Sequence, residues 1–256
     1  MQLGVCTGVD NAALLKNMGW DFIEGNVQGL LKGTEVEWTC PVNLATSALP
    51  MVAANCLVPG NLKITGPEVN PLALQFYMTN VLARAAKAGL DTLVFGSGGA
   101  RNVPEGFDRT QARAQIIAFL QMAAPLAQSQ KVTIVIEHLN RKECNIINSV
   151  GEGLEYARAV NHPNIKVLAD TYHFWLEDES LENLRAAAPL LAHIHMADKE
   201  GRVAPGISGK SDYRPFFTVL KAGGYNGRLS VEAGKFDLAA TGQQVCDYLK
   251  KEWAAA

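Results

Sequence analysis

The chain lacks the features that mark several large classes of protein. Its five cysteines are odd in number, widely spread and never arranged as C-x-x-C, which argues against zinc fingers, dithiol redox chemistry and a disulfide framework. No apolar run approaches the length of a membrane span, and the first residues do not form a secretory signal. The net charge of −2 gives no general attraction to nucleic acid or to a membrane surface. We therefore expect a cytoplasmic protein with neither of these partners.

What the chain does have is a regular recurrence of short apolar runs. With 256 residues, of which 48% are hydrophobic and 19% charged, it can bury a full core. Helical patterns separate most of the runs, and this alternation indicates one parallel sheet. Eight units in a chain of this length predict a (β/α)8 TIM barrel that forms a single domain over residues 1–256. The expected strands are residues 3–6, 21–24, 51–55, 92–96, 133–137, 166–170, 192–196 and 228–232.

Capping residues mark several of the expected helices. Asn70 and Pro71 are typical of a helix start, and Gly89 should end that helix after Ala88. Residues 109–128 have apolar residues at helical spacing, although Pro125 should kink or end the helix. The glycine-rich segment 96–99 is typical of a tight turn, and a phosphate-binding loop is the less favoured alternative.

Chemically active residues stand at the carboxyl ends of the last four expected strands. They are Glu137, Asp170, the pair His193 and His195, and Glu232, spaced by roughly one strand-plus-helix unit each. Parallel α/β folds build their sites at these strand ends, so the side chains should converge. Three carboxylates and one imidazole suit a divalent cation such as Mn²⁺, Mg²⁺, Co²⁺ or Zn²⁺. We choose His195 as the nitrogen ligand because it is nearer the strand end than His193.

Each residue alone also has an ordinary structural interpretation. Glu137 could bond to a neighbouring loop, and Asp170 could cap the helix that follows its strand. Taken together the group is harder to explain in this way, because clustered buried carboxylates repel one another unless a cation is present. We therefore predict that Glu137, Asp170, His195 and Glu232 hold one metal ion.

Longer motifs around these residues carry a family resemblance. They are the segments 137–143, 170–173, 193–195 and 230–232, together with Arg202, Pro205 and Gly206. The chain resembles the xylose isomerase-like barrel superfamily, and within it the ketose 3-epimerases and hydroxypyruvate isomerases. The resemblance implies one divalent ion on the four predicted ligands, with Mn²⁺ favoured. It also implies that Glu143, His173 and Arg202 contact the substrate.

These observations predict a divalent-metal-dependent isomerase or epimerase of a small keto sugar or hydroxy-carbonyl compound. Glu137 and Glu232 should act as the acid/base pair, with a metal-stabilised enediolate between the two proton transfers. Epimerisation and aldose–ketose isomerisation both remain open, and a homo-oligomer is possible. Because acidic residues accompany the basic ones in the expected loops, we favour an unphosphorylated substrate.

Two other function classes are compatible with part of this pattern. A non-catalytic sugar-binding barrel would be favoured if one of the two glutamates were missing, and both are present. An endonuclease IV-like nuclease needs additional histidine ligands from early strands, and no histidine here precedes His138.

Overall fold

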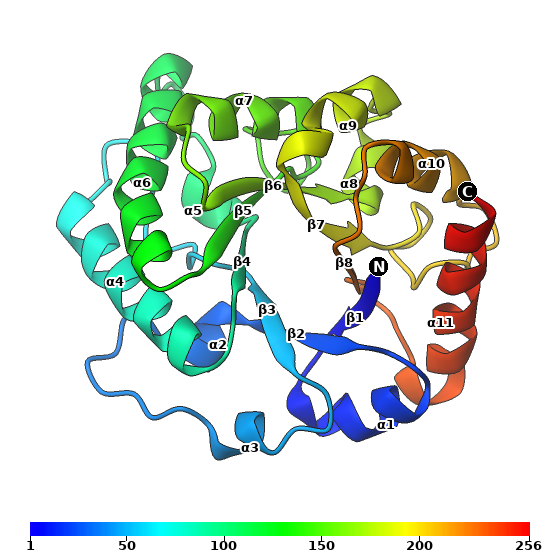
Figure 1. The fold of residues 1–256 in the computed structure, drawn as a ribbon. Helices are drawn as coiled ribbons and strands as arrows, with labels where there is room; N and C mark the ends of the chain where they lie inside the picture. Colours follow the sequence, from blue (N-terminus) through cyan, green and yellow to red (C-terminus); the bar gives the residue numbers. More distant parts are fainter.

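Eight parallel strands close into a barrel in the order of the sequence, in a computed structural model that describes residues 1–256 (Figure 1). The closing contact is between the first and last strands, where Gly4 pairs with Ser230. The fold is therefore the predicted (β/α)8 TIM barrel. The strands are β1 Gln2–Cys6, β2 Phe22–Asn26, β3 Met51–Asn55, β4 Thr92–Phe95, β5 Thr133–Glu137, β6 Ile165–Asp170, β7 Leu191–Met196 and β8 Arg228–Val231.

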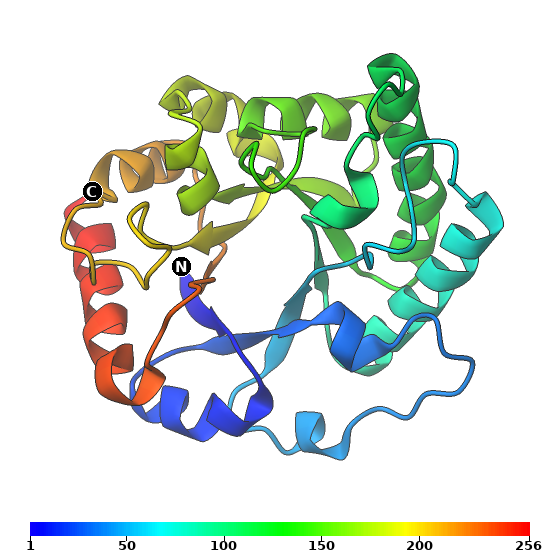
Figure 2. The same cartoon turned by 180° about the vertical axis from the view of Figure 1, so that it is seen from behind.

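Helices surround the barrel as an outer ring, which both faces of the molecule show (Figures 1 and 2). The ring consists of α1 Ala12–Asn17, α4 Pro71–Lys87, α6 Arg109–Ser129, α7 Val150–Val160, α9 Leu181–Ala187, α10 Arg214–Ala222 and α11 Leu238–Ala255. Short helical segments lie between the main elements: α2 Val27–Leu31, α3 Val42–Ala45, α5 Gly98–Arg101, α8 Thr171–Leu176, and the 3₁₀ turns η1 Val9–Asn11 and η2 Ala188–Leu190.

The predicted cap forms at the start of α4, and a cap of the same kind forms at the start of α7. The side chain of Asn70 accepts a hydrogen bond from the backbone of Ala73, and Ser149 does the same for Glu152. These bonds satisfy amide groups that a helix leaves free in its first turn. Gly89 follows α4 with a φ of +81°, a left-handed conformation that glycine adopts without strain.

The expectation for Pro125 was wrong in one respect, because α6 continues past it to Ser129. Pro125 lies on the exposed side of the helix, and so does Gln121, whose carbonyl loses its partner four residues later. Water can bond that carbonyl. The buried residues Ala124 and Ala127 keep the last turn packed against the core, so the proline does not end the helix.

Packing inside the barrel explains why the strand ends carry a polar site. Val94, Val135 and Leu168 form a small, fully buried apolar layer. Side chains two residues apart on a strand share a face, so Glu137 lies on the same face as Val135, and Asp170 on the same face as Leu168. The carboxylates therefore point into the barrel, one step closer to its carboxyl end than the apolar layer.

None of the helices combines the length and the apolar character that crossing a membrane requires.

Candidate metal centre and active site

The four predicted ligands converge at the carboxyl end of the barrel. One ligand atom from each of Glu137, Asp170, His195 and Glu232 lies within 4.8 Å of all the others. Nδ1 of His195 is central: it lies 3.0 Å from Oε1 of Glu137, 3.7 Å from Oε1 of Glu232 and 4.0 Å from Oδ2 of Asp170. His193, two residues earlier, is not part of this cluster.

Asp170 uses its two oxygens differently. Oδ1 caps α8 by accepting hydrogen bonds from the backbone N–H groups of Tyr172 and His173, at 2.7 and 3.1 Å. Oδ2 is buried and has no hydrogen-bond partner. A buried carboxylate oxygen without a partner is costly, and it points toward the other three ligands. The capping role that the sequence suggested as an alternative therefore coexists with a free oxygen that a cation could bind.

Glu24 completes the surroundings of His195, a role that was not predicted. Its Oε1 lies 2.9 Å from Nε2 of His195, and its Oε2 lies 2.7 Å from Nε2 of His193. Burial opposes ionisation of Glu24, but His195 and His193 outweigh it and hold the pKa of this carboxyl well below its usual range. With Nε2 of His195 engaged by Glu24, Nδ1 is directed at the carboxylates. The sequence does contain one indication of this role, because Glu24, like the predicted ligands, follows an apolar run on an expected strand.

Two residues outside the cluster fix the position of Glu137. A Cβ atom on Gly96 would lie 2.1 Å from Oε2 of Glu137, so only glycine leaves room for the carboxylate. Arg101 is fully buried and donates to the carbonyls of Phe95 and Glu137, at 2.8 and 2.7 Å. It thereby ties the end of β4 to the end of β5. The glycine-rich segment leads into the four-residue α5, which begins at Gly98.

The three residues predicted to contact substrate border a cavity of about 320 Å³ directly beside the cluster. Glu143, His173 and Arg202 line it together with Glu137 and Glu232. Nε2 of His173 is buried without a partner. Asp170 and His195 are fully buried. The structure thus places all seven predicted site residues in one region.

Arg202 connects the two acidic sides of this cavity. Its Nη2 donates to Oε2 of Glu232 at 2.6 Å, and its Nη1 lies 3.4 Å from Oε1 of Glu143. The guanidinium also stacks 4.8 Å from the ring centre of Tyr172. Asn55 donates to the other oxygen of Glu232 at 2.7 Å. Neither Tyr172 nor Asn55 was predicted, since their roles depend on contacts between distant segments.

The buried carboxylates of the cluster repel one another, so they favour a positive charge placed among them. Burial raises the pKa of Glu232 to about 7, and the charges of Glu137 and Asp170 add to that rise. Burial alone would lower the pKa of His195, but Glu24, Glu232 and Glu137 raise it well above its usual value. A divalent cation could offset the negative charge that raises these two pKa values. Three carboxylates and one imidazole form a donor set that a hard or borderline cation accepts.

Comparison with known proteins gives one family and several relatives. The family model for xylose isomerase-like TIM barrels matches residues 56–251. A D-psicose 3-epimerase of Ruminiclostridium cellulolyticum is 29% identical over 177 residues, which are 67% of this chain and 59% of that protein. An L-ribulose 3-epimerase of a Methylomonas species is 34% identical over 122 residues, or 47% of this chain and 42% of that protein. The chain thus spans about half the length of these curated relatives.

The fold is also found among solved structures. The 3-keto-D-glucoside 4-epimerase of E. coli superimposes with a TM-score of 0.82 at 21% identity, covering 98% of this chain and 99% of that one. Together with the family match over most of the sequence, this agrees with the closed barrel described above. The chain therefore belongs to the xylose isomerase-like TIM barrel family.

Proposed function

We propose that the protein is a sugar isomerase or epimerase that works with one divalent cation, Mn²⁺ being the favoured ion. The observation that carries this proposal is the convergence of Glu137, Asp170, His195 and Glu232, with a buried, unpartnered oxygen of Asp170 directed into the group. When bound, the cation would polarise the substrate carbonyl and stabilise negative charge on the neighbouring oxygens. The names of the relatives, which are sugar epimerases, support the same reaction class.

Proton transfer is assigned to Glu137 and Glu232. They extend from β5 and β8 and border the same cavity, so a sugar lying between them would present a different face to each carboxylate. One glutamate removes the proton next to the carbonyl. If the other returns a proton to the opposite face of the same carbon, the product is an epimer. Return of the proton to the neighbouring carbon gives an aldose–ketose isomerisation instead.

The remaining cavity residues would bind and orient the sugar. The free Nε2 of His173 can bond a hydroxyl, and Glu143 can accept hydrogen bonds from hydroxyl groups. Arg202 would orient the carbonyl end, since its guanidinium is already held between Glu143 and Glu232. No lysine lines this cavity, and its acidic residues outnumber the single arginine. This balance favours a neutral keto sugar over a sugar phosphate.

Solvent exchange tests the proposal directly. The Mn²⁺-loaded protein, incubated in heavy water with a panel of keto sugars, should incorporate deuterium at the carbon next to the carbonyl, which NMR detects. Glu137→Gln and Glu232→Gln should each slow this exchange by about a hundredfold or more, because an amide cannot accept the proton. The matched control is Glu155→Gln on the exposed side of α7, which should exchange like the original protein. Undiminished exchange in both site variants would show that other residues move the proton.

A further inference from the structure

The buried side chain of Asn140, in the loop after β5, lies between two residues that border the proposed sugar cavity. Its Nδ2 is 2.8 Å from Oε1 of Glu143 and 2.8 Å from Nδ1 of His173. We propose that Asn140 is a positioning residue that fixes His173 as a neutral ring with its proton on Nε2. His173 then donates a hydrogen bond to the substrate while Glu143 accepts one. The consequence for the substrate rests on the proposed function.

The orientation of the Asn140 amide follows from its partners. An ionised carboxylate only accepts hydrogen bonds, so the amide atom beside Glu143 is the nitrogen. The amide oxygen accepts from the backbone N–H of Lys142 at 3.1 Å, which requires the same orientation. The amide nitrogen carries two hydrogens. It can therefore donate to Glu143 and to His173 at the same time.

Nδ1 of His173 faces two N–H donors, and both belong to Asn140. The side-chain amide is one donor, and the backbone N–H, at 3.2 Å, is the other. A ring nitrogen that accepts these hydrogens carries none itself, so the hydrogen of the neutral ring is on Nε2. The opposite tautomer, or a ring protonated on both nitrogens, would place hydrogens against each other. The contacts therefore make His173 a donor through Nε2.

The donor edge of His173 has no partner in the protein. Its Nε2 is buried without a hydrogen bond, and His173 and Glu143 border the same cavity of about 320 Å³. An unpaired buried N–H costs free energy that a bound oxygen would recover. A sugar hydroxyl can accept from His173 through a lone pair and give its own hydrogen to Glu143. Asn140 thus provides one side of the cavity with a fixed donor and a fixed acceptor.

The tautomer can be measured without relying on catalysis. Nitrogen-15 NMR of the full chain with labelled histidine separates protonated from unprotonated ring nitrogens. The variant His173→Gln identifies the His173 signals among those of the five histidines. Without added metal, and again with Mg²⁺ in place of paramagnetic Mn²⁺, we expect Nδ1 of His173 to be unprotonated and Nε2 to be protonated. A proton on Nδ1, or on both nitrogens, would overturn the inference.

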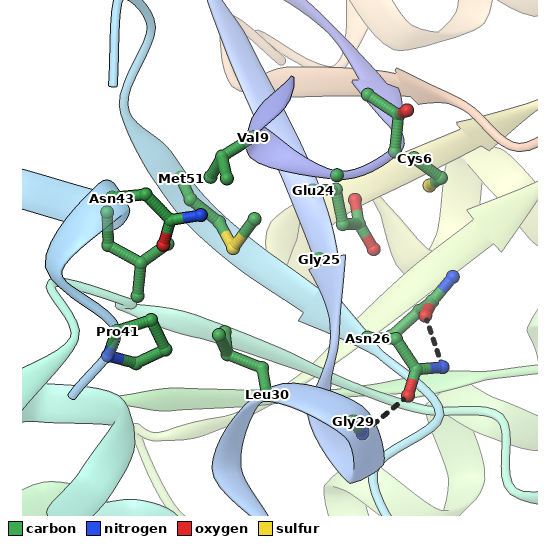
Figure 3. A pocket seen from close by; sticks show the side chains of 14 residues that line it. Cys6, Val9, Glu24, Gly25, Asn26, Gly29, Leu30, Pro41, Asn43 and Met51 are labelled. Carbon is green, nitrogen blue, oxygen red and sulfur yellow. Dashed lines mark hydrogen bonds between the residues drawn. The ribbon is translucent and has the colours of Figure 1, made fainter. Parts of the chain in front are cut away.

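Asn140→Asp tests the part played by the amide. A carboxylate cannot donate to Nδ1 of His173 and favours a proton there, which the NMR signals should report. The matched control is Asn26→Asp, because Asn26 also ends a strand at this end of the barrel but bonds Asn55 and Gly29 instead. Its Oδ1 accepts from the backbone of Gly29 at 3.1 Å, a bond that aspartate keeps (Figure 3). An unchanged tautomer in folded Asn140→Asp would overturn the role of the amide.

Solvent exchange connects the tautomer to the proposed reaction. With Mn²⁺ and a keto sugar, Asn140→Asp should lower kcat/KM for deuterium exchange by about tenfold or more, because the substrate loses the bond from Nε2 of His173. If this variant does not fold, Asn140→Ala, which adds no charge, should lower exchange in the same direction. Normal exchange in a folded variant would overturn the inference and leave the proposed function standing. If the original protein exchanges no sugar, the proposed function fails, and the NMR result alone decides on the tautomer.

Discussion

Glu24 illustrates how a residue that never contacts the proposed cation can define its site. A histidine ligand normally gives its second ring nitrogen to a carboxylate or carbonyl, which fixes the orientation of the ring. Here one carboxylate contacts Nε2 of both His193 and His195, and all three side chains are fully buried or nearly so. The negative charge of Glu24 also favours a positive partner beyond His195.

Replacement of Glu24 should therefore weaken cation binding without removing a ligand. Glu24→Gln loses the charge and replaces one accepting oxygen with an amide N–H₂, so it cannot accept from both histidines. We expect the affinity for Mn²⁺, measured by calorimetric titration, to fall about 10- to 100-fold. Glu155→Gln provides the control for the loss of one negative charge. An unchanged affinity in Glu24→Gln would mean that His195 is oriented by other contacts.

Gly96 gives a second test at the level of one residue. Gly96→Ala would add a methyl group within 2.1 Å of the Glu137 carboxylate, which must then move. Because catalysis depends on sub-ångström placement of the proton-transfer group, we expect solvent exchange to fall by about tenfold or more. Gly153→Ala in α7 is the control, since a Cβ there would make only ordinary contacts of 3.6 Å or longer. Normal exchange in Gly96→Ala would contradict the assignment of Glu137 as a proton-transfer group.

At the level of elements, the two ends of the strands have different roles. The carboxyl ends hold the proposed site, and an ion pair joins two of the amino ends. Asp91, just before β4, accepts two hydrogen bonds of 2.6 Å from Arg228, the first residue of β8. These two strands are four positions apart in a barrel of eight, so the pair spans the amino-terminal opening.

The ion pair between Asp91 and Arg228 should contribute modestly to stability. Both side chains are partly exposed, so Arg228→Ala or Asp91→Asn should lower the free energy of unfolding by about 1 kcal/mol or less in denaturant titrations. Arg158→Ala on the exposed side of α7 is the control. A loss of several kcal/mol would show that the pair contributes more to the free energy of unfolding than its exposure suggests.

The pH dependence of this contribution has a definite sign. Burial opposes ionisation of Asp91, but hydrogen bonds from Arg228 and Thr92 outweigh it and lower its pKa. A group with a lowered pKa in the folded state stabilises fully above its unfolded value, near pH 4, and the stabilisation is lost as the pH falls through the folded pKa. The stability difference between the original protein and Asp91→Asn should therefore shrink below about pH 4. A difference that grows on acidification would contradict the assignment.

For the whole molecule, the sequence predicted what depends on short-range patterns. Apolar runs predicted the barrel and its eight strands to within two residues at each end, and caps predicted the start of α4. The strand-end positions indicated Glu137, Asp170, His195 and Glu232 as candidate ligands. The roles of Glu24 and Gly96 could not be predicted in the same way, since they arise from contacts between different strands of the barrel. Of the two effects expected of Pro125, the end of the helix does not occur, because the outcome depends on which side of α6 faces water.

The cation site is the central claim, and Asp170→Asn tests it most directly. Asparagine is also a good helix cap, so its side-chain oxygen can still accept from the backbone of Tyr172 and His173, while the unpartnered Oδ2 becomes an amide nitrogen. Calorimetric titration with Mn²⁺ should give one site per chain in the original protein and an affinity at least about a hundredfold weaker in Asp170→Asn. The variant should melt no lower than the original protein in the absence of metal and lose the Mn²⁺-dependent rise in Tm. Equal stoichiometry and affinity in the two proteins would contradict the account.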